Sequence, residues 1–332
     1  MTQKTFRALV IESKNKQPCA QFKQLKIADL PNEDILVKVS YSSLNYKDAL
    51  TITGKASICK KVPLIAGIDL SGTIIESKSS DYKEGDKILV NGFGLSEKFN
   101  GGYSQYQRIN PNWIVKVPVS FNEEEVMAIG TAGYTAMLCI QEIQKHGIKP
   151  NKGPILVTGA TGGVGSFAIK LLHKLDFNVS AVTGKVEESS KYLKSIGADE
   201  ILDRKAFHRP SKILESENWS GVIDCTGGSL LATAISQTQR EGIVTACGLA
   251  AGMILNTTVA PFILRGVTLR GIDSVEAPIS KRKKAWEELS RLLTSNELKS
   301  IYNTYPMSRV RELATSLLEG NRNGRVVIDV NR

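Results

Sequence analysis

Residues 154–175 read PILVTGATGGVGSFAIKLLHKL. An apolar run typical of a buried strand passes into a glycine-rich turn, and the turn passes into a stretch whose apolar residues have helical spacing. Glycine is needed in such a turn because a side chain would block a pyrophosphate from the backbone N–H groups at the helix N-terminus. A strand, this turn and a helix in that order predict a dinucleotide-binding motif.

Two glycines of the turn match the dinucleotide fingerprint G-x-G-x-x-G. Gly162 and Gly165 stand at its last two glycine positions, and Ala160 replaces the first. The alternative is a turn that needs glycine only for close packing, but the flanking strand and helix favour the nucleotide. We therefore expect pyrophosphate contacts from four consecutive residues, Thr161, Gly162, Gly163 and Val164.

The end of the next strand should select the cofactor, and it reads Thr183, Gly184, Lys185. An NAD-binding enzyme usually places Asp or Glu there, and a carboxylate would repel a ribose 2′-phosphate. Since a hydroxyl and an ammonium suit a phosphate, the sequence predicts NADPH, with Arg204 after the third strand as a further cationic contact. The alternative for Lys185 is an ordinary surface lysine.

The chain around this motif repeats the pattern of strand and helix. Six apolar runs alternate with helical stretches, at residues 154–160, 179–184, 198–203, 221–227, 242–248 and 267–273. This alternation predicts an α/β fold with a doubly wound parallel sheet of the Rossmann type, covered by helices on both faces. Short β-rich runs over residues 7–116 favour a separate barrel-like β region. The C-terminal part predicts a helix after Ser280, another over residues 308–319, and a closing strand, GRVVIDV.

Composition and charge are those of a globular protein of two domains. The chain has 332 residues, with 43 Lys and Arg against 33 Asp and Glu, and a formal net charge of +10. No stretch approaches the ~20 apolar residues of a membrane-spanning helix, and the first residues lack the pattern of an export signal. We therefore expect a cytoplasmic protein without membrane attachment.

Cysteine and histidine usage gives no sign of a metal or disulfide site. The five cysteines never form a C-x-x-C pair, which suits unpaired thiols in a reducing compartment. The three histidines lack the spacing of metal ligands. Cys225 and Cys247 end apolar strands, and we expect them to be small core residues.

Over nearly its whole length the chain resembles the medium-chain dehydrogenase/reductase superfamily. Within it, the chain is most similar to the zinc-independent YhdH and AcuI type, called acrylyl-CoA reductases or quinone oxidoreductases. The resemblance implies a GroES-like β-rich catalytic domain of residues 1–125 and 273–332, and a Rossmann NADP-binding domain of residues 126–272. The segments that carry it include SSLNYKDAL, PLIAGIDLSGT, GGYSQY, NWIVKVP, IGTAGYTAMLC, VTGATGGVGS, TTVAPFILRGVTLRGIDSV and NGRVVIDV.

The chain departs from the zinc alcohol dehydrogenases of that superfamily at two places. Residues 45–48 read Asn-Tyr-Lys-Asp where those enzymes carry a zinc-binding Cys, and residues 67–69 read Gly-Ile-Asp where they have Gly-His-Glu. The resemblance therefore implies hydride delivery from NADPH without a metal, and we expect no metal site.

The activity implied by the resemblance is reduction of the carbon–carbon double bond of acrylyl-CoA to propanoyl-CoA, and NADPH:quinone reduction is the alternative. The family places the segment of Asn45 and Tyr46 at the cleft between the domains, so we expect these two side chains beside the nicotinamide. The Asn45 amide would donate to the thioester oxygen, and the Tyr46 phenol would bind cofactor or substrate and protonate the product carbanion. The alternatives are a helix N-cap for Asn45 and a packing role for Tyr46.

Three further residues follow from the family pattern. Leu249, Ile263 and Ser274 would lie near the nicotinamide half of the cofactor, although Leu249 and Ile263 are equally well explained as core residues. The strand over residues 267–273 should lie at a sheet edge. Because members of the superfamily commonly join two such edges, we expect a homodimer.

A hypothesis of another class is a non-catalytic NADPH-responsive or nucleic-acid-binding protein. Its best support is the basic run SKRKK at residues 280–284. A solvated helix face with Ser280 as N-cap is the commoner explanation, and no nucleic-acid motif accompanies the run. The expected partner is therefore a small molecule, an acyl-CoA thioester or a quinone.

Overall fold

The chain divides into two compact units in the computed structural model, which describes residues 3–14 and 17–332. The first unit comprises Met1–Thr131 and Val275–Arg332, and the second comprises Ala132–Ser274. The sequence suggested divisions after residues 125 and 272. The earlier division differs because the change of pattern marks the start of helix α2 (Glu123–Lys145), whereas the units separate within that helix.

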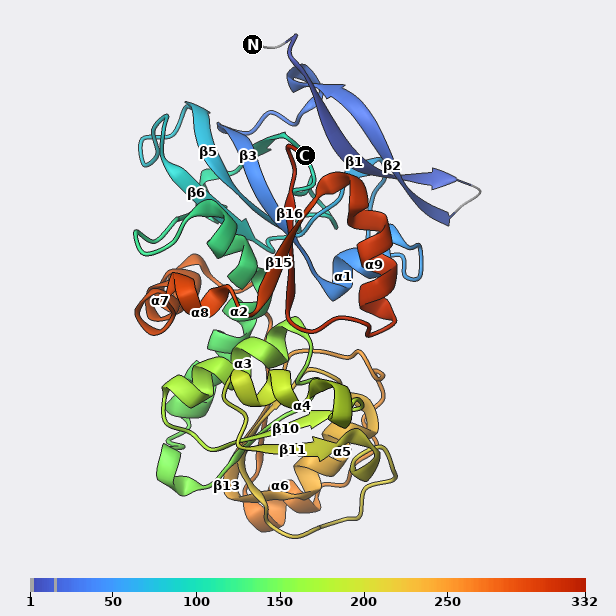
Figure 1. The fold of residues 1–332 in the computed structure, drawn as a ribbon, viewed down its shortest axis with the longest axis vertical. Helices are drawn as coiled ribbons and strands as arrows, with labels where there is room; N and C mark the ends of the chain where they lie inside the picture. Colours follow the sequence, from blue (N-terminus) through green and yellow to red (C-terminus); the bar gives the residue numbers. More distant parts are fainter. Residues whose placement is uncertain (1–2, 15–16) are drawn as a thin grey trace. The chain divides into compact units, whose positions relative to one another are not determined.

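The second unit is built on a six-stranded parallel sheet with strand order β11-β10-β9-β12-β13-β14 (Figure 1). The order reverses between β9 and β12, and in a doubly wound sheet ligands bind at the carboxyl ends beside such a reversal. The predicted sheet and the edge position of β14 are confirmed. The strands are β9 Ile155–Val157, β10 Val179–Thr183, β11 Glu200–Asp203, β12 Trp219–Asp224, β13 Thr238–Ala246 and β14 Thr268–Gly271.

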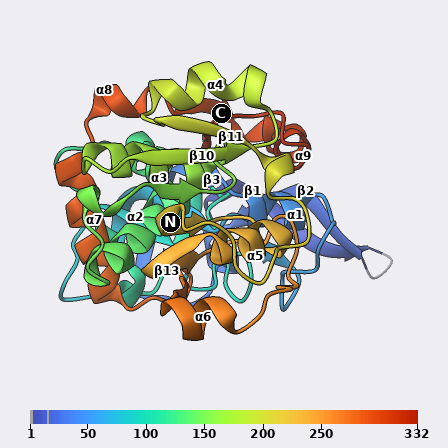
Figure 2. The same cartoon turned by 90° about the horizontal axis from the view of Figure 1, so that it is seen from below.

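Helices cover both faces of this sheet, with α3 and α4 on one face and α5 and α6 on the other (Figure 2). An apolar cluster joins α5 and α6 to the sheet, and its members include Leu230, Ala234 and Val244. Burial on both faces explains why the strands are continuous apolar runs rather than alternating ones. The helices are α3 Gly163–Lys174, α4 Val186–Ser195, α5 Gly228–Ser236 and α6 Ala260–Arg265.

The first unit contains a three-stranded sheet, β2-β1-β4, and a seven-stranded sheet. The larger sheet has the order β15-β16-β3-β5-β6-β8, with β7 paired to β3. Its strand β16 pairs antiparallel with β3, so a segment from the C-terminal part completes a sheet of N-terminal strands. The strands are β1 Thr5–Lys14, β2 Gln17–Lys26, β3 Ile35–Leu44, β4 Leu64–Ile65, β5 Asp69–Ser77, β6 Lys87–Asn91, β7 Tyr106–Ile109, β8 Val115–Lys116, β15 Tyr302–Pro306 and β16 Arg325–Asp329.

Four helices belong wholly to the first unit. Helix α1 (Tyr46–Ile52) follows β3 directly and contacts α9 (Val310–Leu318). Ala49 and Ile52 of α1 lie in the same buried cluster as Val310 and Leu313 of α9. This packing fixes the start of α1, where Asn45 and Tyr46 lie. The other two helices are α7 Ile279–Leu292 and α8 Ser295–Leu298.

Helix α7 differs from the expected helix at its basic run. It begins at Ile279 after Pro278, so Ser280 is not its N-cap. Lys281, Lys283 and Lys284 are exposed, as a solvated face requires.

Arg282, within the same run, is 1% exposed. Its guanidinium donates to the carbonyl oxygens of Asn91, Val275 and Ala277 at 2.5, 2.6 and 3.0 Å, and it lies 3.8 Å from the centre of the Phe93 ring. Arg282 therefore holds the fold of the first unit, and the run offers nucleic acid one cation fewer than its sequence implied.

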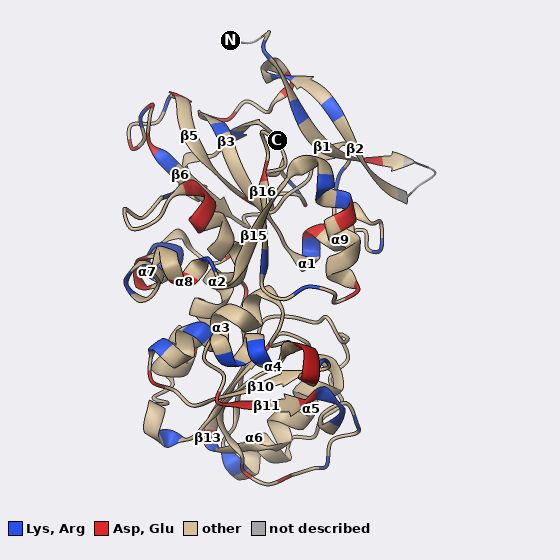
Figure 3. Cartoon of the chain, in the orientation of Figure 1, with Lys and Arg blue, Asp and Glu red and all other residues tan. Residues whose placement is uncertain are grey.

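Helix α2 is the one helix in the described part of the chain that is long and apolar enough to cross a membrane. We expected no segment of that length. Of its most apolar window, 83% is buried, which is typical of a core helix. Non-helical dihedrals at Gly130 (φ 49°, ψ −158°) also interrupt it, and its acidic first turn, red in Figure 3, begins the helix with Glu123, Glu124 and Glu125.

Candidate active site

The glycine-rich turn of the second unit connects β9 to α3. Gly162 is the N-cap of α3, and its N–H donates to the carbonyl oxygen of Gly159 at 3.0 Å. A Cβ atom at Gly165 would stand 2.4 Å from the Gly159 oxygen and 2.7 Å from Cα of Ala160. Glycine is therefore required at 165 for α3 to pack against the turn, as in the dinucleotide fingerprint.

Gly162 has a different role from Gly165 in the turn. It is exposed, and a Cβ atom there would meet only the Gly159 oxygen, at 3.3 Å. Thr161, Gly163 and Val164 around it are each partly exposed. Because the first N–H groups of a helix have no partner within it, and the first turn of α3 holds no acidic residue, this end of α3 suits an anionic ligand group.

The residues expected to select the cofactor meet at the end of β10. The N–H of Lys185 donates to Oγ1 of the buried Thr183 at 3.2 Å. Strand pairing sets Thr183 opposite Asp203, so Arg204 follows on the neighbouring strand. A Cβ atom at the exposed Gly184 would stand 2.9 Å from Cζ of Arg204. The guanidinium group therefore lies over Gly184.

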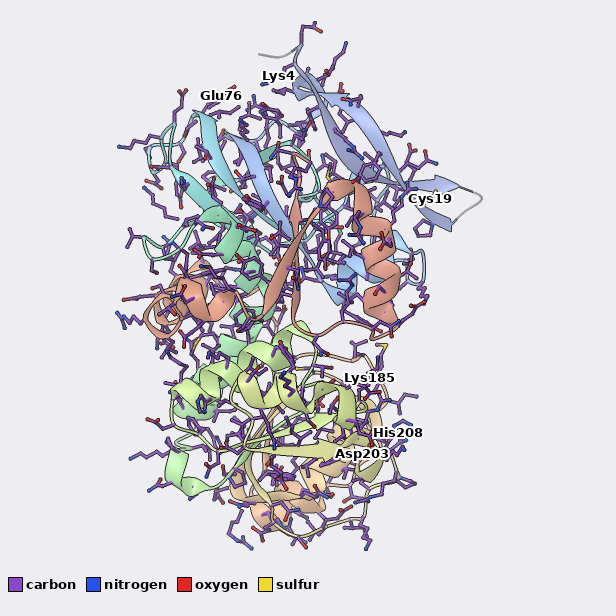
Figure 4. All side chains as sticks on the ribbon, in the orientation of Figure 1. Lys4, Cys19, Glu76, Lys185, Asp203 and His208 are labelled. Carbon is purple, nitrogen blue, oxygen red and sulfur yellow. The ribbon has the colours of Figure 1, made fainter. Side chains whose placement is uncertain are left out.

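No carboxylate takes the place of the missing acidic residue at this strand end, within the described residues 183–185. The nearest acidic residue in the strand pairing, Asp203, accepts a hydrogen bond from the N–H of Lys205 at 2.8 Å and caps the turn that follows β11. Figure 4 labels Lys185 at the start of α4 and Asp203 at the end of β11. The arrangement favours a phosphate over a free ribose hydroxyl.

The residues expected near the nicotinamide half are not core residues. Leu249, in the loop after β13, is 54% exposed, and Ile263 on α6 is 73% exposed. Ser274 is partly exposed at the end of the second unit. The core alternative for Leu249 and Ile263 is therefore wrong. They belong to a series of exposed apolar side chains, Leu249, Met253, Ile254, Val259, Ile263 and Leu264.

Asp69 is the centre of a buried polar cluster in the first unit. Its carboxylate is fully buried at the start of β5 and accepts five hydrogen bonds. The donors are Oγ of Ser43 (2.5 Å), Nδ2 of Asn45 (2.9 Å), Nδ2 of Asn91 (2.7 Å), and both the N–H (3.0 Å) and Oγ1 (2.5 Å) of Thr131. We call this group, with Asp48 and Arg325, the Asp69 cluster.

Arg325 of β16 supplies the positive charge of the Asp69 cluster. Its side chain is buried, Nη1 donates to Oδ1 of Asn45 at 3.0 Å and to the Leu44 carbonyl oxygen at 3.2 Å, and Nε donates to the Ala128 carbonyl oxygen at 3.0 Å. A Cβ atom at Gly130 would stand 2.7 Å from Nη2 of Arg325. The left-handed conformation of Gly130 in α2 and the closeness of this guanidinium both require glycine there.

The Asn45 amide is fully engaged in this cluster. Arg325 donates to its oxygen, and its nitrogen lies within hydrogen-bond distance of oxygens of Asp69, Ser43 and Asp48. The expected role of Asn45 as a donor to a substrate oxygen disagrees with these contacts, because its amide hydrogens already face buried acceptors. Asn45 is the N-cap residue of α1, as the alternative has it.

Asp48 is a member of the cluster that sequence reasoning missed. Its fully buried carboxylate accepts from the N–H groups of Asn45 and Ile68, both at 3.0 Å. Burial raises the pKa of the Asp48 carboxyl to about 7, and the charge of Asp69 contributes to the rise. The sequence did hold a sign of this cluster, since both Asp48 and Asp69 lie in the segments that replace zinc ligands. Arg325 is too remote in sequence to be connected with them by a local pattern.

Tyr46 is the first residue of α1, and its side chain is 43% exposed. The packing alternative is therefore wrong for Tyr46. The neighbouring Lys47 forms an ion pair with Glu97. Of the two expected catalytic residues, Tyr46 is the one whose side chain remains open to a ligand.

The cluster does not fit a bound metal. Among residues 3–14 and 17–332, no group of three or more His, Cys, Asp or Glu side chains is arranged as a metal site. In the segments that replace the zinc ligands, the Asp69 carboxylate already accepts five hydrogen bonds.

Two family models match the chain, an alcohol dehydrogenase GroES-like domain over residues 31–119 and a zinc-binding dehydrogenase over residues 163–295. Acrylyl-CoA reductase AcuI of Ruegeria pomeroyi is 42% identical, over 98% of this chain and 99% of that protein. The chain belongs to the medium-chain dehydrogenase/reductase superfamily. The predicted α/β fold with Rossmann and GroES-like parts is that of this family.

Two solved structures of the family are similar over the whole chain. The crystal structure of YhdH of E. coli K-12 with bound NADPH has a TM-score of 0.95 and 41% identity, and it covers 98% of this chain and 100% of that chain. The structure of YhfP of Bacillus subtilis with bound NAD has a TM-score of 0.93 and 36% identity, with coverage of 98% and 100%. YhfP bears the name of a quinone oxidoreductase.

Proposed function

We propose that this protein is an NADPH-dependent reductase that acts without a metal. It reduces the carbon–carbon double bond of acrylyl-CoA and so produces propanoyl-CoA. The observation that carries the proposal is the 42% identity with an acrylyl-CoA reductase over the full length of both chains. The guanidinium of Arg204 over Gly184 supports NADPH as the cofactor, as does the NADPH bound in YhdH.

Residues of the second unit would hold the cofactor. The turn of Thr161, Gly162, Gly163 and Val164 would bind the pyrophosphate, because this end of α3 is open and free of acidic residues. Lys185 and Arg204 would bind the 2′-phosphate beside Thr183 and Gly184. The exposed Leu249 and Ile263, with Ser274, would contact the nicotinamide half.

The bound cofactor would supply the hydride that reaches the β-carbon. The chain must then supply a proton for the α-carbon, and donors for the negative charge that develops on the thioester oxygen. Tyr46 is our candidate for the proton, because its exposed phenol can reach a ligand. Asn45 holds the start of α1 in place through the Asp69 cluster and so positions Tyr46.

Tyr46→Phe tests this role. The variant should keep its stability, since the side chain is partly exposed, and should lose turnover by roughly 10²-fold, the effect of removing a general acid. Turnover and cofactor affinity equal to those of the unchanged protein would rule out Tyr46.

The substrate is tested by a direct comparison of acceptors. NADPH oxidation is measured with acrylyl-CoA and with simple quinones under identical conditions, and propanoyl-CoA is identified by mass spectrometry. Saturable turnover of acrylyl-CoA supports the proposal. Saturable turnover of quinones alone would reject it in favour of the second candidate, NADPH:quinone reduction, which the name of YhfP favours.

We also infer a cytoplasmic homodimer. The exposed edge strand β14, with Leu269 partly exposed on it, is suited to pairing with a second copy. The cytoplasmic location is supported by the burial of α2 and by five unpaired thiols. Light scattering at micromolar concentration tests the assembly, and a monomeric mass contradicts it.

A further inference from the structure

Three cysteines meet in the second unit. Cys139 lies on α2, Cys225 directly after β12 and Cys247 directly after β13. The Sγ atoms of Cys225 and Cys247 are 3.9 Å apart, and the thiol of Cys139 also interacts with Cys247. The remaining two cysteines, Cys19 and Cys59, belong to the first unit.

The backbone brings Cys225 and Cys247 side by side. Strands β12 and β13 pair in parallel as far as Asp224 opposite Ala246, and the two cysteines are the next residues in that register. The N–H of Cys247 donates to the Asp224 carbonyl oxygen at 2.9 Å, which continues the pairing. Neighbouring strands lie about 4.8 Å apart, within the range of Cα separations that disulfides span.

Little movement is needed to bond the two sulfur atoms. An S–S bond is about 2.05 Å long, so the sulfur atoms must approach by less than 2 Å, and side-chain rotation can supply this. The loops that carry them are already joined, since the N–H of Ala251 donates to the Thr226 carbonyl oxygen at 2.7 Å. A disulfide can therefore close in the folded protein.

The two thiols differ from Cys139 in access and from each other in reactivity. Cys225 and Cys247 are half-buried at the ends of their strands, whereas Cys139 is fully buried. Sγ of Cys247 lies within hydrogen-bond distance of Sγ of Cys225 at 3.9 Å and of the Asp224 carbonyl oxygen at 3.4 Å, and its interactions with the thiols of Cys139 and Cys225 lower the pKa of Cys247. Cys247 is our candidate for the nucleophile of the pair, because a lowered pKa favours the thiolate, which is the reactive form.

We propose that Cys225 and Cys247 form an oxidation site, at which a hydroperoxide converts the two thiols to an intramolecular disulfide. The Cys247 thiolate attacks the peroxide oxygen, an S–O bond forms as the O–O bond breaks, and an alcohol or water leaves after taking up a proton. The Cys225 thiol then attacks that sulfur, the S–S bond forms, and the sulfenic oxygen leaves as water. The thiols lose two electrons, and the peroxide gains two.

The experiment treats the folded full chain with hydrogen peroxide in the absence of reductant. Thiols are counted, and a proteolytic digest is examined by mass spectrometry without reduction. We expect the loss of two of the five thiols, a peptide link between Cys225 and Cys247, and full recovery with dithiothreitol. A link through Cys139, or a link between Cys225 and Cys247 that forms only in urea, overturns the proposal.

Single serine variants separate the two steps. Cys225→Ser should stop at a sulfenic acid on Cys247, which dimedone traps, and Cys247→Ser should give neither the acid nor the link. Cys139→Ser is the matched control from the same cluster and should still form the Cys225–Cys247 disulfide. Dimedone labelling of Cys225 in the Cys247→Ser variant, at the rate seen for Cys247, would contradict the assignment of the nucleophile.

Discussion

The Asp69 cluster of the first unit and the glycine-rich turn of the second differ in where their polar groups find hydrogen-bond partners. The Asp69 carboxylate is fully buried and accepts five hydrogen bonds from its own unit. The turn exposes Gly162 at the start of a helix whose first N–H groups have no partner within it, and Arg204 lies over the exposed Gly184.

This difference separates residues that hold the fold from residues that await a ligand. By resemblance, the segments around Asn45 and Asp69 stand where related enzymes bind zinc, yet here they form a buried hydrogen-bonded network with Arg325. Polar residues in the place of a known site are therefore not by themselves a site. Exposure and unused hydrogen-bonding capacity support our proposal that the turn binds the cofactor.

The largest effect is expected from Asp69→Ala. The variant leaves Arg325 without its buried counter-charge and removes the acceptor of five hydrogen bonds, so it should lose about 3–5 kcal/mol in the free energy of unfolding. Urea unfolding measures this, and Asp69→Asn serves if the alanine variant does not fold. The exposed Asp81→Ala is the control and should change stability by less than about 0.5 kcal/mol. Equal losses for Asp69→Ala and Asp81→Ala would mean that the Asp69 cluster does not hold the fold.

The two glycines of the turn should respond differently to alanine. Gly165→Ala should cost about 2–3 kcal/mol and weaken NADPH binding, because its Cβ atom meets backbone at 2.4 Å. Gly162 has extended dihedrals (φ −73°, ψ 171°) that alanine adopts, so Gly162→Ala should keep its melting temperature and lose about tenfold in NADPH affinity. Thermal unfolding and cofactor titration measure both. Unchanged affinity in Gly162→Ala would remove the turn from the binding region.

Asp48 makes the stability of the first unit depend on pH. Its pKa is raised from 3.8 to about 7 in the folded state, so the folded protein binds the proton more tightly than the unfolded chain does. This contribution is fully present below about pH 4 and is lost as the pH rises through about 7, which amounts to about 2–3 kcal/mol between pH 5 and pH 8.

Urea unfolding of the unchanged protein and of Asp48→Asn, between pH 5 and pH 8, isolates this contribution. The difference in unfolding free energy between the two proteins should fall as the pH rises, since the amide does not titrate. A difference that stays constant over this range would show that Asp48 is ionised in the folded protein.

The smallest effect is expected at the end of β10. Arg204→Ala and Lys185→Ala should each lower the preference for NADPH over NADH by about tenfold, close to 1.4 kcal/mol, because one cation near the 2′-phosphate is removed. Kinetics with both cofactors measure the ratio. The exposed neighbour Lys205→Ala is the control and should leave the ratio unchanged. An unchanged ratio in both variants would move the 2′-phosphate site away from Gly184.

The fold and the turn could be predicted from sequence because their signals are local. The strand, turn and helix of residues 154–175 are contiguous, and the apolar runs of the sheet follow one another in order. The Asp69 cluster could not be predicted from sequence, because Ser43, Thr131 and Arg325 come together only after β16 has paired with β3. The Cys225 and Cys247 pair likewise depends on the register of β12 and β13, which no local pattern reports.

The position of β16 between β15 and β3 has a consequence for synthesis on the ribosome. Because β16 follows the whole second unit in sequence, residues 132–274 can fold before the first unit has all of its strands. Until β16 emerges, the nascent first unit holds Asp48 and Asp69 without Arg325. The part of the chain that is made first is therefore the part that is completed last.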